Sequence, residues 1–267
     1  MLLTKSLEAR GPFAIGDALS ARSTWATARA VAGFSGYGNL LTPPNANEKI
    51  AKSERLIYSL SLAPANMAGV NVCAFSTAAC RAVCVLKTAG NALYPMVQRA
   101  RIVKTQFLNE NPAAFVSLLA SEIRRAIGKH GAENVSFRLN TASDIRWEKV
   151  APELFSITGA TFYDYTKYPA EHRSPGENYR LVFSVSERKT SDAFARDYLK
   201  NGRNVAVVFD TKKGHALPNT WEGFPVLDGD RTDDRTIDPA GYVVGLRAKG
   251  SARGKRGSAT GFVRAAG

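Results

Sequence analysis

Three cysteines stand close together in a chain that contains no others. Cys73, Cys80 and Cys84 are separated by six and then three residues. If a helix begins near Arg81, Cys80 and Cys84 point the same way, because residues four apart lie on one helix face. Cys73, in the preceding loop, can complete a cup of three thiolates. The spacing therefore predicts a metal site.

A set of three thiolates leaves a metal incompletely ligated. A closed structural zinc site takes four protein ligands, and a four-iron cluster takes four cysteines when the protein holds every iron. We therefore expect an open metal position for a substrate or cofactor. Two alternatives remain, namely a zinc site completed by His130, His172 or His215, and three buried cysteines that only pack as small apolar side chains.

Of these alternatives we favour a four-iron, four-sulfur (4Fe-4S) cluster, with S-adenosylmethionine as a candidate ligand of the open iron. The cysteines follow the first expected core strand, and radical S-adenosylmethionine enzymes hold their cluster after the first strand of an α/β barrel. The spacing of six and three residues departs from the three and two of that superfamily. The likeness is one of architecture only.

The elements that must position the cysteines alternate between strands and helices. Strands are expected at Leu56–Leu62, Val135–Leu139, Thr161–Tyr165, Arg180–Val185, Val205–Phe209 and Tyr242–Leu246, and helices at Leu93–Leu108, between Asn111 and Gly131, at Trp147–Ile157 and at Ser191–Lys200. The Val205–Phe209 strand is apolar on both faces, which favours a parallel sheet covered on both sides. We predict an α/β fold with a partial (β/α) barrel-like core of about six mostly parallel strands.

Polar side chains gather just after nearly every expected strand, and the carboxyl ends of parallel strands form the active edge in such folds. The candidates for acid–base catalysis are Asp144, Asp164, Lys167 and Glu187. The candidates for substrate binding are Arg138, Asn140, Ser143, Tyr165, Ser184 and Lys249. An arginine suits a phosphate or carboxylate, and an asparagine suits the edge of a base.

Several of these residues have a structural alternative. Asp144 could cap the next helix or pair with Arg138 instead of acting in catalysis. In the expected Thr161–Tyr165 strand, Tyr163 and Tyr165 share one face and Asp164 takes the other. The tyrosines could stack on a base or fill the core. The acidic run that begins at Asp228 is expected to be a surface turn.

Charge is the main compositional excess. Lys and Arg number 36 against 23 Asp and Glu, a net charge of +13. Such a charge is typical of proteins that meet nucleic acid, a phosphate-rich ligand or an acidic membrane face, unless it reflects only a basic proteome, and of these partners we expect nucleic acid or a nucleotide. No run approaches the roughly 18 apolar residues of a membrane span. The opening sequence lacks the apolar core of a secretory signal, so we expect a cytoplasmic protein.

The chain divides into three expected segments. Residues 1–46 form an irregular N-terminal arm with a short helix around Thr24–Val31, residues 47–250 form the α/β barrel-like core, and residues 251–267 form a basic, flexible tail. Gly and Ser are interleaved with the cations of the tail, a composition typical of mobile segments. The tail is either a solvated end or a segment that contacts phosphates.

An ordered series of motifs carries a resemblance to a known family. They are SLSLAPANMAGVNVC, RLNTASDIRWE, FYDYTK, NYRLVFSVSE, NVAVVF, PVLDGDRTDDR and VVGLRAKG. In this order the sequence resembles the phage- and plasmid-associated gene product 88 family over about residues 56–263. The resemblance implies a mobile-element origin and a cytoplasmic setting in a bacterial host, and it brings no established activity.

Two function hypotheses follow. The first is a metal-dependent, iron–sulfur enzyme of radical S-adenosylmethionine type that acts on a nucleotide or nucleic acid. The second is a non-catalytic nucleic-acid-binding protein in which the cysteines hold a structural zinc and the basic tail supplies affinity.

Overall fold

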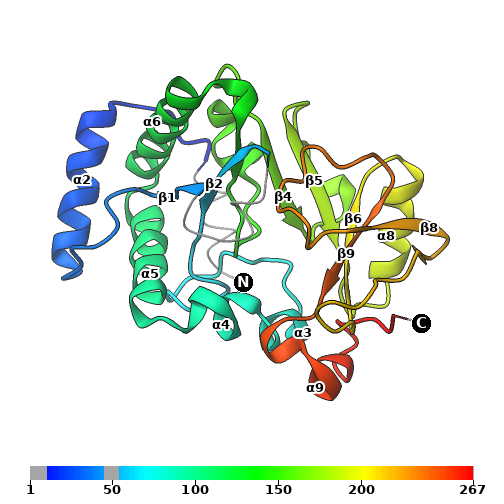
Figure 1. Cartoon of the computed structure of the whole chain (residues 1–267). Helices are drawn as coiled ribbons and strands as arrows, with labels where there is room; N and C mark the ends of the chain where they lie inside the picture. The colour runs from blue at the N-terminus through cyan, green and yellow to red at the C-terminus, as the bar shows by residue number, and fades with distance from the viewer. Residues whose placement is uncertain (1–10, 45–53, 267) are drawn as a thin grey trace.

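The computed structural model of the chain describes residues 11–44 and 54–266, and Figure 1 shows its helices and strands. The α-helices are α2 (Ala18–Val31), α3 (Ala78–Ala82), α4 (Val85–Thr88), α5 (Pro95–Glu110), α6 (Pro112–His130), α7 (Trp147–Val150), α8 (Ser191–Lys200) and α9 (Gly254–Ser258). The strands are β1 (Leu41–Thr42), β2 (Leu56–Leu60), β3 (Val135–Arg138), β4 (Phe162–Thr166), β5 (Tyr179–Ser184), β6 (Val205–Phe209), β7 (Thr220–Trp221), β8 (Phe224–Asp228) and β9 (Val243–Arg247). Short 3-10 helices are η3 (Gly90–Leu93), η4 (Ala132–Asn134), η5 (Pro152–Ser156), η6 (Ala170–His172) and η7 (Gly250–Ala252).

The strands form one mostly parallel sheet in the order β1-β2-β3-β4-β5-β6-β9-β8-β7. Neighbours from β2 to β9 are parallel, and β8 is parallel to β9. The short strands β1 and β7 pair antiparallel at the two ends, so the sheet is not closed. From β2 to β6, spatial order follows chain order, as in one side of a (β/α) barrel. The mixed α/β fold and its six predicted strands are confirmed.

Helices cover one face of the sheet. Trp25 of α2, Phe107 of α5 and Phe115 of α6 belong to the same buried cluster as Phe137 of β3 and Phe162 of β4. The apolar spacing of α6 predicted one buried face, and it packs as expected. Farther along the sheet, α8 takes the same role with a second cluster that joins Ala195, Tyr198 and Leu199 to Phe183, Val207 and Val243. We call this side the helix-covered face.

The opposite side, which we call the inner face, carries the alternate residues of the same strands. Tyr165, Val182, Ala206, Val244 and Leu246 pack together there. The connection between β8 and β9 (residues 229–242) reaches this face, because Asp233 forms an ion pair with Arg138 at 3.0 Å. Within that connection Asp234 and Arg235 are fully buried. The expected acidic surface turn is therefore wrong at these residues, because the segment packs against strands instead of solvent.

Both ends of the described chain are more ordered than the sequence indicates. Helix α2 is 14 residues long, begins at a cap in which Asp17 accepts a hydrogen bond from the Ser20 amide, and buries Trp25. At the other end, Ala252 and Val263 are buried with Val83 and Ala248. Part of the expected tail therefore packs against residues of the expected core, and it contains the short helix α9.

The end of the sheet beyond the carboxyl ends of the strands is built from short helices. Figure 1 shows α3, α4 and α9 gathered at one end of the molecule. Helix α3 follows β2 and α9 follows β9, so residues far apart in sequence meet there. No helix among residues 11–44 and 54–266 is long and apolar enough to cross a membrane.

Candidate functional site

A cavity of about 250 Å³ lies at the carboxyl ends of the parallel strands. Its walls include Arg138 of β3, Tyr165 of β4, Ser184 of β5, Val208 of β6 and Leu246 of β9. Since these strands are spread over most of the sheet yet line one space, the inner face is concave around it. The cavity is bounded on its other side by the cysteine-bearing segment, and Cys73, Cys80 and Cys84 all line it.

Cys73 is held by backbone groups on both sides. Its thiol donates a hydrogen bond to the carbonyl of Ala142 at 3.1 Å and accepts one from the amide of Ala65 at 3.4 Å. Burial raises the pKa of the Cys73 thiol to about 12, more than the Ala65 amide lowers it. Cys73 is thus a protonated thiol at neutral pH, and any metal that bound it would have to displace the proton.

Cys80 and Cys84 reach the same cavity from different elements. Cys80 lies in α3, which ends at Ala82, and Cys84 precedes the first residue of α4. The expectation that both lie on one helix face is therefore wrong, because the helix is interrupted between them. Burial raises the pKa of the Cys84 thiol, the neighbouring Cys80 raises it further, and the positive charges of Lys87 and Arg101 oppose that rise.

The three thiols are near enough to influence one another electrostatically, since Cys80 and Cys84 both raise the pKa of Cys73. The part of the chain that the structure describes contains no group of three or more His, Cys, Asp or Glu side chains arranged around a single ion position.

Glu187 anchors the cysteine segment instead of lining the cavity. Its carboxylate accepts hydrogen bonds from the Thr77 hydroxyl at 2.6 Å and from the Ala79 amide at 3.1 Å. Thr77 in turn caps α3 by accepting from the amide of Cys80. These hydrogen bonds lower the pKa of Glu187, although burial opposes them. Glu187, which follows β5, therefore fixes the start of the short helix that carries Cys80.

Asn140 organises the turn after β3. Its Oδ1 accepts from the Ser143 hydroxyl at 2.8 Å and from the Ile145 amide at 3.0 Å, and its Nδ2 donates to the Ile145 carbonyl at 2.9 Å. Asn140 and Ser143 both line the cavity. Because the amide group of Asn140 is fully engaged with the protein, its main effect is to shape the turn.

Asp164 lies on the helix-covered face, behind this turn. Its carboxylate accepts hydrogen bonds from the backbone amide of Asn140 at 2.7 Å and from the Tyr179 hydroxyl at 2.8 Å. Burial raises the pKa of Asp164 to about 7, against the effect of these two donors. The structure thus places this candidate outside the cavity, in contact with the residue that shapes its wall.

Asp144 borders the cavity but is tied down by three donors. Its carboxylate accepts from the Thr166 hydroxyl and the Lys167 amide, both at 2.8 Å, and forms an ion pair with Arg173 at 3.3 Å. Burial raises its pKa and the charge of Arg173 lowers it. The expected ion pair between Asp144 and Arg138 is wrong, because Asp144 pairs with Arg173 and Arg138 pairs with Asp233.

Lys167, Ser184, Tyr165 and Arg138 form the polar part of the cavity wall. The Lys167 ammonium donates to the Ser184 hydroxyl at 2.7 Å and lies 5.0 Å from the ring centroid of Phe262. The Arg138 guanidinium lies over the ring of Tyr165 at 4.9 Å. Burial lowers the pKa of Arg138, but Asp233 and the neighbouring Tyr163 and Tyr165 raise it by more, so this side chain stays a cation.

A second cavity, of about 550 Å³, adjoins the first, because Val85, Leu86, Arg138 and Thr141 line both. Lys249 lines this second cavity and not the first, and its ammonium pairs with Asp230 at 2.8 Å. Arg101 and Lys104 of α5 also line it, and both are buried.

The chain matches the family model described as gene product 88 over residues 38–266. It belongs to the gene product 88 family. The resemblance of the ordered motifs is thereby confirmed, and the matched region contains all three cysteines and every candidate residue of the site. No curated protein and no solved structure matches the chain.

Sequence reasoning missed the buried cations of this member of the gene product 88 family. Arg173 binds both carboxylate oxygens of Glu148 and also contacts Asp144. Arg101 and Lys104 are three apart in α5, beside the buried Val103 and Leu108. Charged residues on the apolar side of an amphipathic helix are the signal that could have identified these two.

Proposed function

We propose that this protein is a metal-dependent enzyme in which Cys73, Cys80 and Cys84 hold a 4Fe-4S cluster, and that it acts on a nucleotide or nucleic acid. One observation carries the proposal: three cysteines from one short segment line one cavity at the carboxyl edge of a parallel sheet, beside polar side chains from several strands. In parallel α/β folds this edge is where ligands bind.

Three cysteines line one cavity and could supply three ligands to a cluster, although among the described residues they are not arranged around a single ion position. Three thiols leave one iron without a protein ligand, and the cavity provides room next to them. Burial raises the pKa of the Cys84 thiol, and Lys87 and Arg101 offset only part of that rise, so a bound metal would have to favour the thiolate that ligates it. A structural zinc is closed off by four protein ligands and binds no further ligand, so it would not account for a cavity beside the cysteines. When bound, a cluster with an open iron would supply one electron to S-adenosylmethionine.

The chain's own residues would hold the substrate and position the loop. Lys167, fixed by the Ser184 hydroxyl, presents a cation to the cavity, and Tyr165 offers an aromatic wall under Arg138. Glu187 and Asp164 are assigned to positioning, because each contacts the cysteine loop or the Asn140 turn and neither lines the cavity. Asp144 holds the strand-end backbone at Lys167.

The nucleotide or nucleic acid in this proposal is supported by charge. The chain carries a net charge of +13, and Arg138 of β3, Lys167 just after β4 and Arg101 of α5 are among the cations that line the two adjoining cavities. Cations that converge on a concave surface attract anionic ligands more strongly than the same cations spread over a convex one.

Anaerobic purification followed by absorption spectroscopy and analysis of iron, sulfide and zinc tests the proposal. We expect a brown protein with iron and acid-labile sulfide, which Cys80→Ala loses. Thr141→Val is the matched control, because Thr141 lines the same cavity with a buried hydroxyl that has no partner among the described residues. A colourless protein with one zinc per chain would favour the non-catalytic nucleic-acid-binding alternative. Protein without any bound metal would overturn both readings.

A further inference from the structure

Four cations line the second cavity, and three of them have an acidic neighbour: Lys249 pairs with Asp230, Arg138 pairs with Asp233, and the pKa of Lys104, which burial lowers, is raised in part by Glu122. Arg101, Lys104, Arg138 and Lys249 border it, and Asp233 is the one carboxylate among its lining residues within the described chain. The cations come from α5, β3 and the segment after β9, so they approach the space from several directions.

Arg101 is the most unusual of these side chains. Only 7% of it is exposed, its Nη1 donates to the carbonyl of Leu86 at 3.0 Å, and its Nε is buried without a hydrogen-bond partner among the described residues. None of the ion pairs found in the described ranges involves Arg101. A buried cation without an anionic partner is costly, and an anion that binds beside it recovers that cost.

Arg138 has the same feature at the boundary between the two cavities. One arm of its guanidinium pairs with Asp233, and its Nε is buried without a partner among the described residues. Its register partner on β2 is Ser59, whose hydroxyl-bearing side chain also lines the second cavity. The polar wall of the second cavity therefore contains the guanidinium groups of Arg101 and Arg138, each with a buried Nε that has no partner among the described residues, and the hydroxyl of Ser59 on β2.

We propose that the second cavity binds a phosphate group of the substrate, with Arg101 and Arg138 as its hydrogen-bond donors. A phosphate accepts several hydrogen bonds at once and carries more than one charge, so it matches guanidinium forks that converge from different elements better than a carboxylate does. The phosphate belongs either to a free nucleotide or to a nucleic-acid backbone. This inference rests on the proposed function only in calling the bound molecule a substrate. Phosphate binding in the second cavity does not require the cysteines.

Binding assays on the full chain test the proposal with three probes: inorganic phosphate, a fluorescent nucleoside monophosphate and a short single-stranded DNA. We expect Arg101→Gln to weaken binding of at least one probe by about tenfold or more, as loss of a charged hydrogen-bond donor does. Arg99→Gln is the matched control, because Arg99 lies on the same helix, is exposed and donates to the carbonyls of Ala32 and Gly33.

A second variant protects the test against a misfolded protein. Lys249→Gln changes a side chain that is 45% exposed, so the fold should tolerate it, and we expect about threefold weaker binding. Binding of the monophosphate identifies a free nucleotide as the source of the phosphate, and binding of DNA alone identifies a backbone. Wild-type affinity in both Arg101→Gln and Lys249→Gln, or no binding of any probe to the wild type, would overturn the proposal.

The same assay on Cys80→Ala separates this inference from the proposed function. Phosphate affinity that persists in Cys80→Ala, while Arg101→Gln loses it, supports the phosphate site whether or not a cluster is found. Loss of metal without loss of phosphate binding would thus assign the two roles to two adjoining cavities.

Discussion

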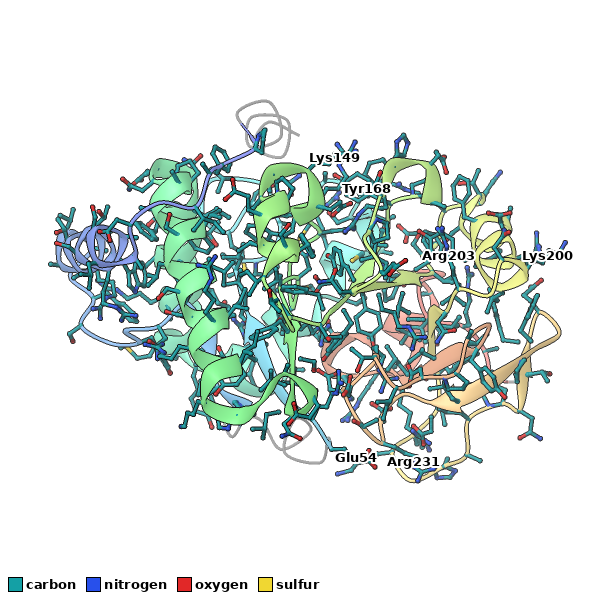
Figure 2. The ribbon with its side chains drawn as sticks, turned by 90° about the horizontal axis from the view of Figure 1, so that it is seen from above. Glu54, Lys149, Tyr168, Lys200, Arg203 and Arg231 are labelled. Atoms are coloured by element: carbon teal, nitrogen blue, oxygen red, sulfur yellow. The ribbon has the colours of Figure 1, made fainter. Side chains whose placement is uncertain are left out.

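Two sets of buried polar residues, one on each face of the sheet, differ in how they are hydrogen bonded. On the helix-covered face, Asp164 is enclosed, and Asn140 and Tyr179 both donate to it. On the inner face and in the adjoining cavity, Arg138 and Arg101 each keep a buried Nε without a partner among the described residues. Figure 2 shows how densely side chains fill the space between the ribbons. Asp164, Arg138 and Arg101 are all largely enclosed by protein, so what distinguishes Asp164 from the two arginines is the number of hydrogen bonds each makes within the protein.

Hydrogen bonding separates residues that hold the fold from residues that are available to a ligand. A buried polar group with all its partners inside the protein stabilises one conformation. A buried polar group with unused donors costs stability until something binds. Substitutions on the helix-covered face should consequently change the free energy of unfolding, and substitutions on the inner face should change binding.

The largest effect is expected for Asp164→Ala. The change leaves the Asn140 amide and the Tyr179 hydroxyl without their acceptor inside the core, which should cost about 3 kcal/mol and lower the melting temperature by roughly 6–12 °C. Differential scanning calorimetry measures the shift. A melting temperature within two degrees or so of the wild type would show that the two faces do not differ in this way.

The pH dependence of stability gives a second test at the same residue. The folded pKa of Asp164 is about 7 against an ordinary value of 3.8, so between these values the folded chain holds a proton that the unfolded chain has lost. The contribution of this group to stability is therefore full below pH 4, declines as the pH rises to 7 and is constant above it.

Asp164→Asn removes that titration and keeps a side chain of the same size. We expect the wild type to lose stability relative to Asp164→Asn as the pH rises from 4 to 7, measured by urea denaturation at each pH. The difference between the two proteins cancels the titration of other groups. A difference that does not change with pH would mean that the carboxylate stays ionised in the fold.

A local effect is expected for Glu187→Gln. The amide retains one acceptor and loses the charge, so α3 is capped less well, at a cost of about 1 kcal/mol. Amide hydrogen exchange in residues 78–82 should become about fivefold faster. Glu222→Gln, which changes an exposed ion pair with Arg196, is the control and should leave this exchange unchanged. Equal exchange in both variants would mean that Glu187 does not position the cysteine segment.

Much of the fold could be predicted from periodicity because local pattern and tertiary packing agree there. The apolar spacing between Asn111 and Gly131 matches α6, and the doubly apolar Val205–Phe209 became β6, which sits between β5 and β9. The packing of the C-terminal segment could not be predicted, because Val263 is buried against Val83, which lies far away in the sequence.

The sequence predicted that the site lies at the carboxyl ends of the strands, but not which of the candidate residues line the cavity and which only position other residues. Alternation placed Asp164 opposite Tyr165, but nothing in one strand tells which face carries the cavity. The interruption between Cys80 and Cys84 depends on short helices, and α3 is capped by Glu187, more than a hundred residues away along the chain. Such long-range hydrogen bonds leave no mark in local sequence.

The smallest effect on stability is expected for Lys167→Met. Methionine keeps most of the aliphatic chain beside Phe262, and the Ser184 hydroxyl that loses its partner borders a cavity that water can enter, so the free energy of unfolding should change by less than about 1 kcal/mol. Urea denaturation measures it. If Lys167→Met is destabilised as strongly as Asp164→Ala, then Lys167 belongs to the scaffold. If stability is retained and nucleotide binding weakens, then Lys167 contributes to ligand binding at the cavity and not to the stability of the fold.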